Sequence, residues 1–538
     1  MDEDSYDYVI VGAGSAGCVL AERLTASGRH TVLLIEAGGG DRRFWIRTPL
    51  GYARTFRDPS VNWCYQTEED DGLGGRRGYW PRGRVVGGCS SINAMVWLRG
   101  LPEDFDGWEA AGALGWNWRS ALRAYEAIEA RDDDASPCAA VRLSDLGEDR
   151  HPFTRHFLAA ARQMGWPASA SAGGNSGEGL STLVSTRRRG RRWSAADAFL
   201  APALKRPNLR LVTRALVERL SVAGGRARGV VYRRRGRRRV ARAGREVIVS
   251  AGAINSPQLL QLSGIGPAGT LRAHGIEPVL DLAEVGRGLQ DHLALSSHFE
   301  ATEATLNGAL GCWLGRSAAG ARYLLSRRGP LSLPVNQIGG FVRSARDVET
   351  PDLQIYCNPI GYRVRPDGGA LVRPEPGFLL SAQPCRPTSR GEVMIASPDP
   401  ERPPSIRPNS LSTRHDEVMA VRAARVLERL ARTPAISAVT RARRSPETDG
   451  GDDAALLEDF RARALTVFHP SCTCRMGRDA RDSVLDPRLR VHGLRGLRVV
   501  DASAFPSVTS GNTNAPVMML AARAAELILE DAGGPAAP

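Results

Sequence analysis

The N-terminal stretch carries a regular succession of apolar and polar positions. Tyr8 to Val11 form a short apolar run that ends abruptly at Gly12, which is typical of a buried parallel strand. The residues that follow predict a helix to about Thr25, with Gly28 as its stop, and Thr31 to Ile35 form a second apolar run. The pattern therefore predicts two parallel strands joined by a helix.

A glycine fingerprint lies at the turn between the first strand and the helix: Gly12, Gly14 and Gly17, spaced as G-x-G-x-x-G. Gly12 allows the tight turn, Gly14 lets the backbone approach a pyrophosphate, and Gly17 lets the helix pack closely on the strand. The free N–H groups and positive dipole end of the helix face the same phosphates. Glu36 follows Gly17 by 19 residues (36 − 17), near the offset of an acid that holds ribose hydroxyls and repels a 2′-phosphate. These features predict a dinucleotide site and argue against NADP, but they do not choose between NAD and FAD.

Strands and helices continue to alternate along the chain. We predict a helix over Phe153 to Met164, a strand pair over Asn208 to Val217, and a hairpin over Gly229 to Val249. Val247 to Gly266 reads as strand, glycine turn and helix, and Gly496 to Glu530 reads as strand, loop and long helix. The fold class is therefore α/β in its nucleotide-binding part, and α+β overall.

Composition fits a globular enzyme of two or three domains. The chain has 538 residues, of which 24% are charged and 42% hydrophobic, and no run approaches a membrane span of roughly 20 apolar residues. The N-terminus is acidic and lacks a secretory signal pattern, so we expect a cytoplasmic protein without a transmembrane segment. Peripheral association with a membrane stays open. Nine irregularly spaced cysteines argue against a disulfide framework.

The formal charge is +14, and 71 of the 72 basic residues are arginine. Two clusters stand out, at 187–192 (RRRGRR) and 233–245 (RRRGRRRVARAGR). A basic cluster can bind nucleic acid or an anionic membrane surface. Because no nucleic-acid-binding motif accompanies either cluster, we predict solvated loops and no nucleic-acid partner.

Two segments carry candidate chemistry. In Arg82 to Gly100, a glycine pair followed by small polar residues suits close approach to a flat polar ring and to phosphates, although it also fits a capped helix start. His469, Cys472 and Cys474 offer metal-ligand atoms, but Cys-x-Cys is not a usual zinc spacing. The alternative is that His469 is a general base, since the ordinary histidine pKa near 6.5 suits proton transfer. We predict no metal.

These segments, in this order, resemble the glucose–methanol–choline (GMC) oxidoreductases, FAD enzymes that oxidise alcohols, and in particular their choline dehydrogenase-like alcohol dehydrogenases. Arg82 to Gly100 is similar to the family's first signature, Val247 to Gly266 to its second, and Val467 to Gly477 to the motif that holds its active-site histidine. The resemblance implies a Rossmann-like FAD-binding domain over 1–150, 200–297 and 466–538. It also implies a substrate-binding domain, an antiparallel sheet with helices, over 151–199 and 298–465.

The resemblance also implies site residues. His469 is the implied catalytic base, and Asn512 is the second catalytic residue, where many relatives have histidine and choline-type relatives have asparagine. Ile92 stands where some members attach FAD through a histidine, so non-covalent FAD is implied. The implied FAD-binding residues are Gly12, Gly14, Ser15, Ala16, Gly17, Glu36, Ala37, Arg84, Val86, Gly87, Gly88, Ser91, Asn93, Ala94, Met95, Val96, Val217, Ala251, Gly252, Asp501, Ala502, Asn512, Asn514 and Ala515. Asn336, Gln337 and Phe468 are predicted to face the substrate pocket, while structural and functional readings of Asp291 and His292 both stay open.

The implied reaction takes a primary or secondary alcohol to an aldehyde or ketone. His469 would remove the hydroxyl proton while a hydride passes to flavin N5, and a quinone, a dye or oxygen would reoxidise the flavin. Three alternatives stay open: a hydroxynitrile lyase on the same scaffold, a choline dehydrogenase or oxidase proper, and an NAD dehydrogenase suggested by the glycine fingerprint alone. The sequence does not indicate an oligomeric state.

Overall fold

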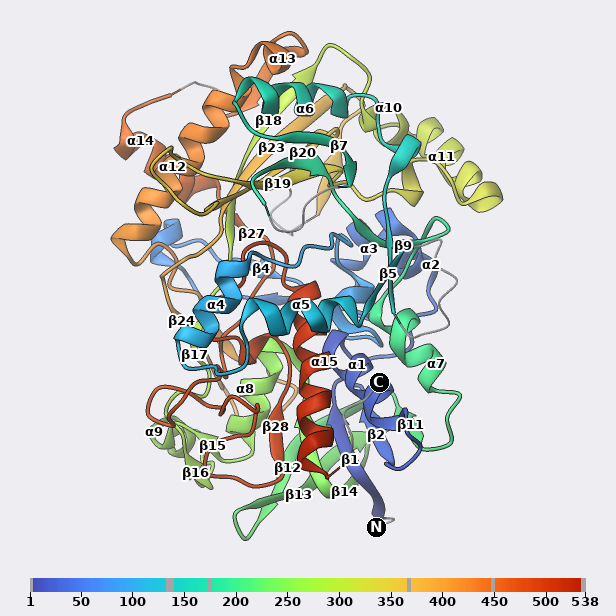
Figure 1. Cartoon of the computed structure of the whole chain (residues 1–538), viewed down its shortest axis with the longest axis vertical. Helices are drawn as coiled ribbons and strands as arrows, with labels where there is room; N and C mark the ends of the chain where they lie inside the picture. Colours follow the sequence, from blue (N-terminus) through green and yellow to red (C-terminus); the bar gives the residue numbers. More distant parts are fainter. Residues whose placement is uncertain (1–2, 132–139, 173–176, 365–368, 447–449, 534–538) are drawn as a thin grey trace.

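The structure is a computed structural model that describes residues 3–131, 140–172, 177–364, 369–446 and 450–533. Two β-sheets dominate it, one toward each end of the long axis (Figure 1). Helices cover both sheets, and long irregular segments run between them.

The first sheet has seven strands in the order β11-β2-β1-β14-β13-β12, with β28 pairing β14. β1 (Glu3–Val11) pairs in parallel with both β2 (Val32–Ile35) and β14 (Arg237–Val249), and β11 (Leu209–Val212) and β28 (Leu497–Val499) extend the parallel part. The buried strands β1 and β2 are parallel, as predicted, with Tyr8 opposite Val32 and Val11 opposite Ile35.

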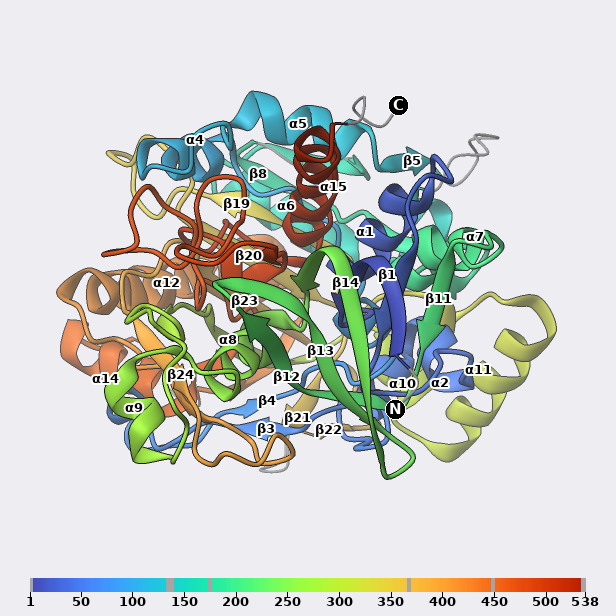
Figure 2. The same ribbon diagram turned by 90° about the horizontal axis from the view of Figure 1, so that it is seen from below.

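Helices and a hairpin complete this half. α1 (Ser15–Thr25) and α15 (Asn514–Asp531) pack against each other (Figures 1 and 2), and α8 (Gly252–Leu262) follows β14 directly. β12 (Ala215–Ala223), β13 (Arg226–Arg234) and β14 form the antiparallel part of the sheet, including the predicted hairpin. The helix α1 ends where the sequence predicts.

The second sheet is antiparallel throughout its described pairs, in the order β19-β20-β23-β18-β26, with β27 pairing β18. Its long strands are β18 (Leu293–Ala301), β20 (Leu353–Asn358) and β23 (Gly377–Pro384). α12 (Arg414–Ala431) and α6 (Thr154–Gln163) pack on it through a common hydrophobic core. The other strands are β19 (Ile338–Val342), β26 (Thr440–Ser445) and β27 (Leu465–Thr466).

The first arginine cluster differs from its prediction, because two of its side chains are buried. Arg192 is 1% exposed and donates hydrogen bonds to the carbonyls of Ile46 and Ser90 and to Oδ1 of Asn93. Burial lowers the pKa of Arg192 to about 9. Arg187 is also buried and donates to the Ser332 carbonyl. Three carbonyl-type acceptors replace the water around the Arg192 guanidinium. Two of them belong to Ser90 and Asn93, so Arg192 stabilises the conformation of the 90–93 segment. The turn of the second cluster, at 235–238, is exposed as predicted.

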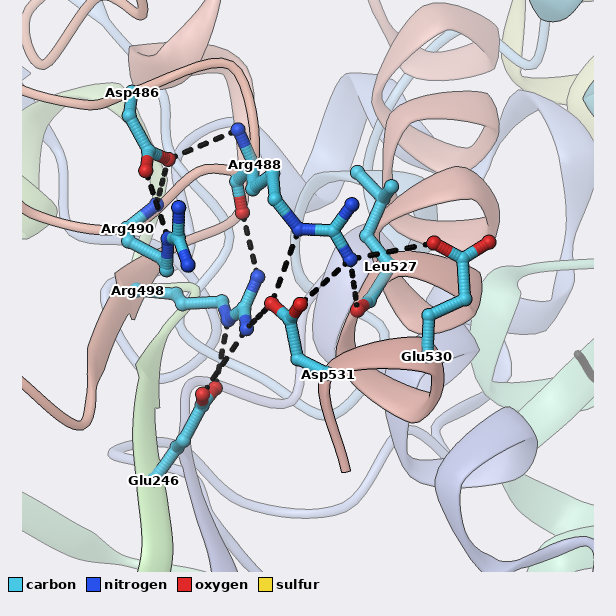
Figure 3. A network of polar contacts seen from close by, with 8 residues as sticks. All are labelled: Glu246, Asp486, Arg488, Arg490, Arg498, Leu527, Glu530 and Asp531. Carbon is cyan, nitrogen blue, oxygen red and sulfur yellow. Dashed lines mark hydrogen bonds and ion pairs between the residues drawn. The ribbon is translucent and has the colours of Figure 1, made fainter. Parts of the chain in front are cut away.

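An ion network fastens the far end of α15 (Figure 3). Arg498, in β28, is 1% exposed and forms paired hydrogen bonds of 2.7 and 3.0 Å with the Glu246 carboxylate. It also contacts the carboxylate of Asp531, the last residue of α15, at 2.6 Å. Arg488 donates to Asp531 and to the Leu527 carbonyl. An acid at a helix C-terminus is unfavourable by itself, and the two arginines compensate for it.

Candidate active site

A cavity of about 2590 Å³ is lined by residues of both sheets. Gly12, Glu36 and Val217 line it from the first sheet and its turns, and Tyr356 and Ser381 line it from the second. Ligand pockets in proteins typically measure roughly 300–1,000 Å³. The cavity is therefore large enough for a dinucleotide together with a small substrate.

Glycine is required at one end of the cavity because three backbone segments meet there. Gly12 has φ +101°, and a Cβ at this position would clash with the Ser250 carbonyl. A Cβ on Gly17 would clash with the Gly12 carbonyl, and one on Gly88 would lie 2.7 Å from Cα of Gly14. The fingerprint turn and the second glycine pair are thus pressed together at the N-terminus of α1, which has no side-chain cap. Gly14, Ser15 and Ala16 line the cavity at this helix N-terminus, and such a site suits an anion.

Glu36 stands at the end of β2 on the cavity wall. Its Oε2 accepts a hydrogen bond of 2.9 Å from Ala13 N, and its Oε1 accepts one of 2.8 Å from Gly38 N. Burial raises the pKa of Glu36 to about 7, against these two bonds and the charge of Arg84. The backbone therefore fixes the carboxylate beside the glycine turn, at the place predicted for a ribose-binding acid.

Most of the predicted cofactor residues line the cavity. The lining set is Gly12, Gly14, Ser15, Ala16, Glu36, Ala37, Gly88, Asn93, Ala94, Met95, Val96, Val217, Ala251, Gly252, Asp501, Ala502, Asn512 and Asn514. The remaining predicted residues, which are not among those that line the cavity, are Gly17, Arg84, Val86, Gly87, Ser91 and Ala515. Ser91 donates to the Val86 carbonyl, Gly87 N donates to the Ala13 carbonyl, and the Arg84 guanidinium lies 4.5 Å from the Trp63 ring centre. These three contacts tie together segments that are next to the lining residues.

A chain of hydrogen bonds fixes the protons on two buried histidines. His292 Nε2 lies 2.8 Å from the Cys385 carbonyl, which only accepts, so Nε2 carries the proton. His292 Nδ1 is then an acceptor, and it lies 3.0 Å from His469 Nδ1, which must donate. In the neutral ring, His469 Nε2 is therefore left with a lone pair. Nε2 lies 3.1 Å from Asn512 Nδ2, and both side chains line the cavity.

Asn512 and the loop before His469 are held in turn. Tyr356, in β20, donates to Asn512 Oδ1 at 3.3 Å, which directs the amide nitrogen toward His469. The backbone N of His469 donates to Asp291 Oδ1 at 2.7 Å, and Thr466 also donates to this carboxylate. Burial raises the pKa of Asp291 to about 6. Phe468 has φ +70°, a left-handed conformation that costs a non-glycine residue on the order of 1 kcal/mol. Residues around His469 thus position it at the expense of local strain.

Of the three residues predicted to face the substrate pocket, two line the cavity and one does not. Phe468 and Asn336 line the cavity. Gln337 does not: it is fully buried, and its Oε1 accepts from the backbone N of His151 at 2.9 Å. The chain becomes extended as it approaches β19, and successive side chains of an extended chain point to opposite faces. The side chains of Asn336 and Gln337 therefore point in opposite directions.

The predicted alternative of a metal at His469, Cys472 and Cys474 finds no support in the geometry. Both cysteines are buried in the hydrophobic core around the first sheet, and Cys472 Sγ contacts Gln290 Oε1. In the part of the chain that the structure describes, no group of three or more histidine, cysteine or acidic side chains is placed to hold a metal ion. No described helix is long and apolar enough to cross a membrane.

Comparison with known proteins identifies the architecture. Two family models, both described as GMC oxidoreductase, match residues 6–294 and 387–521. The chain belongs to the GMC oxidoreductase family. It is 38% identical to the oxygen-dependent choline dehydrogenase of Vibrio vulnificus (strain YJ016), with 98% of this chain and 95% of the relative covered. It is also 38% identical to the alcohol dehydrogenase [acceptor] of Pseudomonas putida, with 97% and 96% covered.

Solved structures of this GMC fold are similar over nearly the whole chain. Pyridoxine 4-oxidase from Mesorbium loti superposes with a TM-score of 0.85 at 30% identity, covering 96% of this chain and 98% of that one. Formate oxidase superposes with a TM-score of 0.89 at 25% identity, covering 99% of both. The expected α/β fold, with a Rossmann-like part and an antiparallel sheet, is confirmed.

The residues of this GMC oxidoreductase fit FAD, its cofactor. The glycines at the start of α1 let the turn, Ser250 and Gly88 come closer together than a Cβ would allow, and Glu36 is fixed beside this turn. Asp501 lines the cavity, and its oxygens accept from Gly252 N at 2.8 Å and Ser503 N at 2.8 Å. Ile92 also lines the cavity and offers no nucleophile for a covalent link, in keeping with non-covalent binding.

Sequence reasoning missed two residues of the site. His292 was left open between structural and functional readings, and its role depends on the carbonyl of Cys385, which lies 93 residues away. Tyr356 carries no local signal, since it is one aromatic residue in a buried strand. Only the pairing of distant segments brings His292 to His469 and Tyr356 to Asn512.

Proposed function

We propose that this GMC oxidoreductase oxidises a primary or secondary alcohol to an aldehyde or ketone, with His469 as base and Asn512 as its partner. The observation that carries the proposal is the lone pair on His469 Nε2, which the hydrogen-bond chain through His292 directs toward Asn512 and the cavity. Bound FAD supplies the acceptor, at its N5, for the hydride that leaves the alcohol carbon.

In this mechanism, Nε2 of His469 receives the hydroxyl proton of the alcohol. Burial, then His292 and Arg82, hold the pKa of His469 well below its usual range, so the ring is neutral before substrate binds. After the transfer, the Nδ1 proton stays on the bond to His292, so the ring keeps its orientation. The hydrogen bond to His292 thereby holds His469 in one tautomer, and no carboxylate needs to bind its Nδ1.

Asn512 acts on the oxygen of the substrate. Its amide nitrogen faces His469 because Tyr356 donates to the amide oxygen. An alcohol oxygen beside both Nε2 and Nδ2 would lose its proton to the histidine and accept a hydrogen bond from the amide. Such a donor stabilises charge that develops on oxygen in the transition state.

Choline is a second candidate substrate, favoured by an aromatic wall beside His469. Tyr52, Phe56 and Phe468 all line the cavity, with ring centres 5.3 Å apart for the first pair and 5.4 Å for the second. Aromatic faces attract a quaternary ammonium by cation–π interaction. Several relatives, including the Vibrio vulnificus protein, are named choline dehydrogenases.

The electron acceptor is proposed to be a quinone, a dye or oxygen. The named relatives include both an oxygen-dependent enzyme and an acceptor-dependent one, so they do not choose between these classes.

The domain division expected from the sequence is also kept as a proposal, with one change. Because β18 (Leu293–Ala301) is one strand of the second sheet, the boundary moves from 297 to 292.

The test is the visible spectrum of the FAD-loaded protein while alcohols are added without oxygen. We expect the flavin band to bleach with some primary or secondary alcohol. His469→Ala should slow bleaching by about 10²- to 10⁴-fold, the range for loss of a general base. His274→Ala, at a histidine outside the cavity lining, should bleach as the wild type does. Equal bleaching by wild type and His469→Ala would refute the assigned base.

Choline is tested against its neutral isostere, 3,3-dimethyl-1-butanol, in the same cell. If the aromatic wall binds the ammonium, choline should bleach the flavin at concentrations roughly tenfold or more below the isostere, as about 2 kcal/mol of cation–π energy implies. Equal concentration dependence would remove choline from consideration. Readmitting air then separates an oxidase, whose band returns quickly, from a dehydrogenase.

A further inference from the structure

Helix α11 (Trp313–Ser326) presents an apolar face to solvent, which reverses the usual arrangement of a surface helix. Its inward face packs through the buried ring of Tyr323. Its outward face is a stripe at helical spacing in which every member is exposed: Leu314, Ala318, Ala321 and Leu325. Leu325 exposes 89% of its surface. Figures 1 and 2 both place α11 at the periphery of the molecule.

Neighbouring residues enlarge this stripe into a patch. α2 (Phe44–Arg47) lies beside α11, with ring centres of Phe44 and Tyr323 6.2 Å apart. The α11 patch is defined here as Phe44, Trp45, Trp313, Leu314, Leu324 and Leu325. These are 6 of the 11 large apolar residues that the described chain exposes. Exposed apolar residues scattered singly are ordinary, whereas a gathered patch marks an interaction surface.

The rim of the α11 patch is basic. From residue 304 to residue 346 the sequence contains no aspartate or glutamate, but it contains Arg316, Arg322, Arg327 and Arg328. Among the described residues, no carboxylate forms an ion pair with these four. Gly190 lies against the backbone of Arg327, so the exposed Arg189 and Arg191 of the first arginine cluster adjoin the same rim.

We propose that the α11 patch docks this protein on the surface of an anionic lipid bilayer. Exposed leucine and tryptophan beside arginine are the composition of segments that lie in a membrane interface. A second copy of the chain fits less well, because a symmetric contact would bring two unpaired arginine rims together. Nucleic acid would leave the outward leucines without a partner.

The patch is continuous with the cavity. Trp45 and Arg316 belong to the patch and its rim, and both also line the cavity. Docking would therefore place this wall of the cavity at the lipid surface. The described chain needs no membrane-crossing helix for this mode of binding, which buries only one face.

The test is co-sedimentation of the full-length, FAD-loaded protein with lipid vesicles. Vesicles of phosphatidylcholine with about one quarter phosphatidylglycerol should bind it at low salt, and pure phosphatidylcholine should bind it much less. Leu314→Gln with Leu325→Gln should weaken the partition coefficient by roughly tenfold or more. Arg322→Gln with Arg328→Gln should weaken it by roughly fivefold for each arginine.

Matched variants on other faces control for surface charge and hydrophobicity in general. Leu114→Gln removes a leucine that is 58% exposed, and Arg235→Gln with Arg237→Gln removes two exposed arginines of the hairpin turn. Both should partition as the wild type does, and all variants should keep their flavin band. Absence of wild-type binding to the anionic vesicles, or equal loss in the hairpin variant, would overturn the proposal. So would a wild-type dimer in solution that the leucine variant dissociates, since the patch would then be an interface between copies. Because binding needs no turnover, these outcomes do not depend on the proposed reaction.

Discussion

One backbone carbonyl sets the proton positions of the proposed base. The Cys385 carbonyl fixes the Nε2 proton of His292, and this in turn fixes the Nδ1 proton of His469. Mechanisms that use a histidine base commonly orient it with a carboxylate. Here neutral His292 takes the position of that carboxylate, so no negative charge stabilises the imidazolium that forms on His469. The arrangement agrees with the lowered pKa of His469, which favours loss of the acquired proton to water after the reaction.

His292→Leu and His292→Asn separate positioning from packing. Leucine removes the acceptor for the His469 Nδ1 proton, so the wrong tautomer becomes accessible and flavin reduction should slow by on the order of 10²-fold. Asparagine can place its side-chain oxygen near the position of Nδ1, so it should restore most of the rate. The ¹⁵N resonances of His469 in the FAD-loaded protein report the tautomer directly. An unchanged tautomer in His292→Leu would rule out this role for His292.

The pH dependence should show an acidic limb that belongs to Asp291. Burial raises the pKa of Asp291 to about 6, so above this pH its charged carboxylate is the stronger acceptor for His469 N. As pH falls through about 6, protonation weakens that bond and flavin reduction should slow. Asp291→Asn cannot titrate, so its limb should move to lower pH, where His469 itself protonates. Stopped-flow bleaching from about pH 5 to about pH 9 measures both; a limb that stays near 6 in Asp291→Asn would assign it elsewhere.

At the scale of single elements, helical glycines differ in how much space surrounds them. A Cβ on Gly17 would meet the Gly12 carbonyl, whereas Gly107, in α4 (Pro102–Ala110), has open space around it. Gly17→Ala should therefore push α1 away from β1 and lower the flavin content of the purified protein severalfold or abolish it. Gly107→Ala should purify with full flavin content. The ratio of flavin absorbance to protein absorbance measures the difference, and a fully loaded Gly17→Ala would contradict the packing role.

Local elements were predictable because their signals are local. The strand, turn and helix over Tyr8 to Thr25 follow from periodicity and glycine spacing; in the structure the strand and the helix end at the predicted residues, Val11 and Thr25, although the strand begins earlier, at Glu3. Arg192 was not predictable in the same way. A cluster of arginines normally lies in solvent, and only the distant carbonyls of Ile46 and Ser90 make its burial tolerable. Asn336 and Gln337 were equally hard to predict. They are neighbours in the sequence, and a shift of one residue decides which side chain lines the cavity and which is buried.

At the scale of the whole molecule, the site exists because two sheets face one cavity. His469 and Asn512 come from the chain's return to the first sheet, and Tyr356 comes from the second. The family resemblance predicted the first two residues because they lie in motifs. It did not predict Tyr356, whose contribution depends on how the two sheets are placed. Anything that loosens the first sheet should therefore disturb the proposed catalytic pair, His469 and Asn512, far from the change.

The network at the end of α15 offers the sharpest test of that coupling (Figure 3). Arg498→Met would leave the carboxylates of Glu246 and Asp531 without their buried partner, which costs on the order of 3 kcal/mol. The helix whose first turn follows Asn512 would then lose its anchor at the opposite end. We expect a clearly lower urea midpoint for loss of the flavin band, and slower bleaching by alcohol. Arg490→Met removes a half-exposed pair with Asp486 in the same network, worth roughly 0–1 kcal/mol, and should change little. Equal midpoints for the two variants would show that Arg498 does not hold α15 in place.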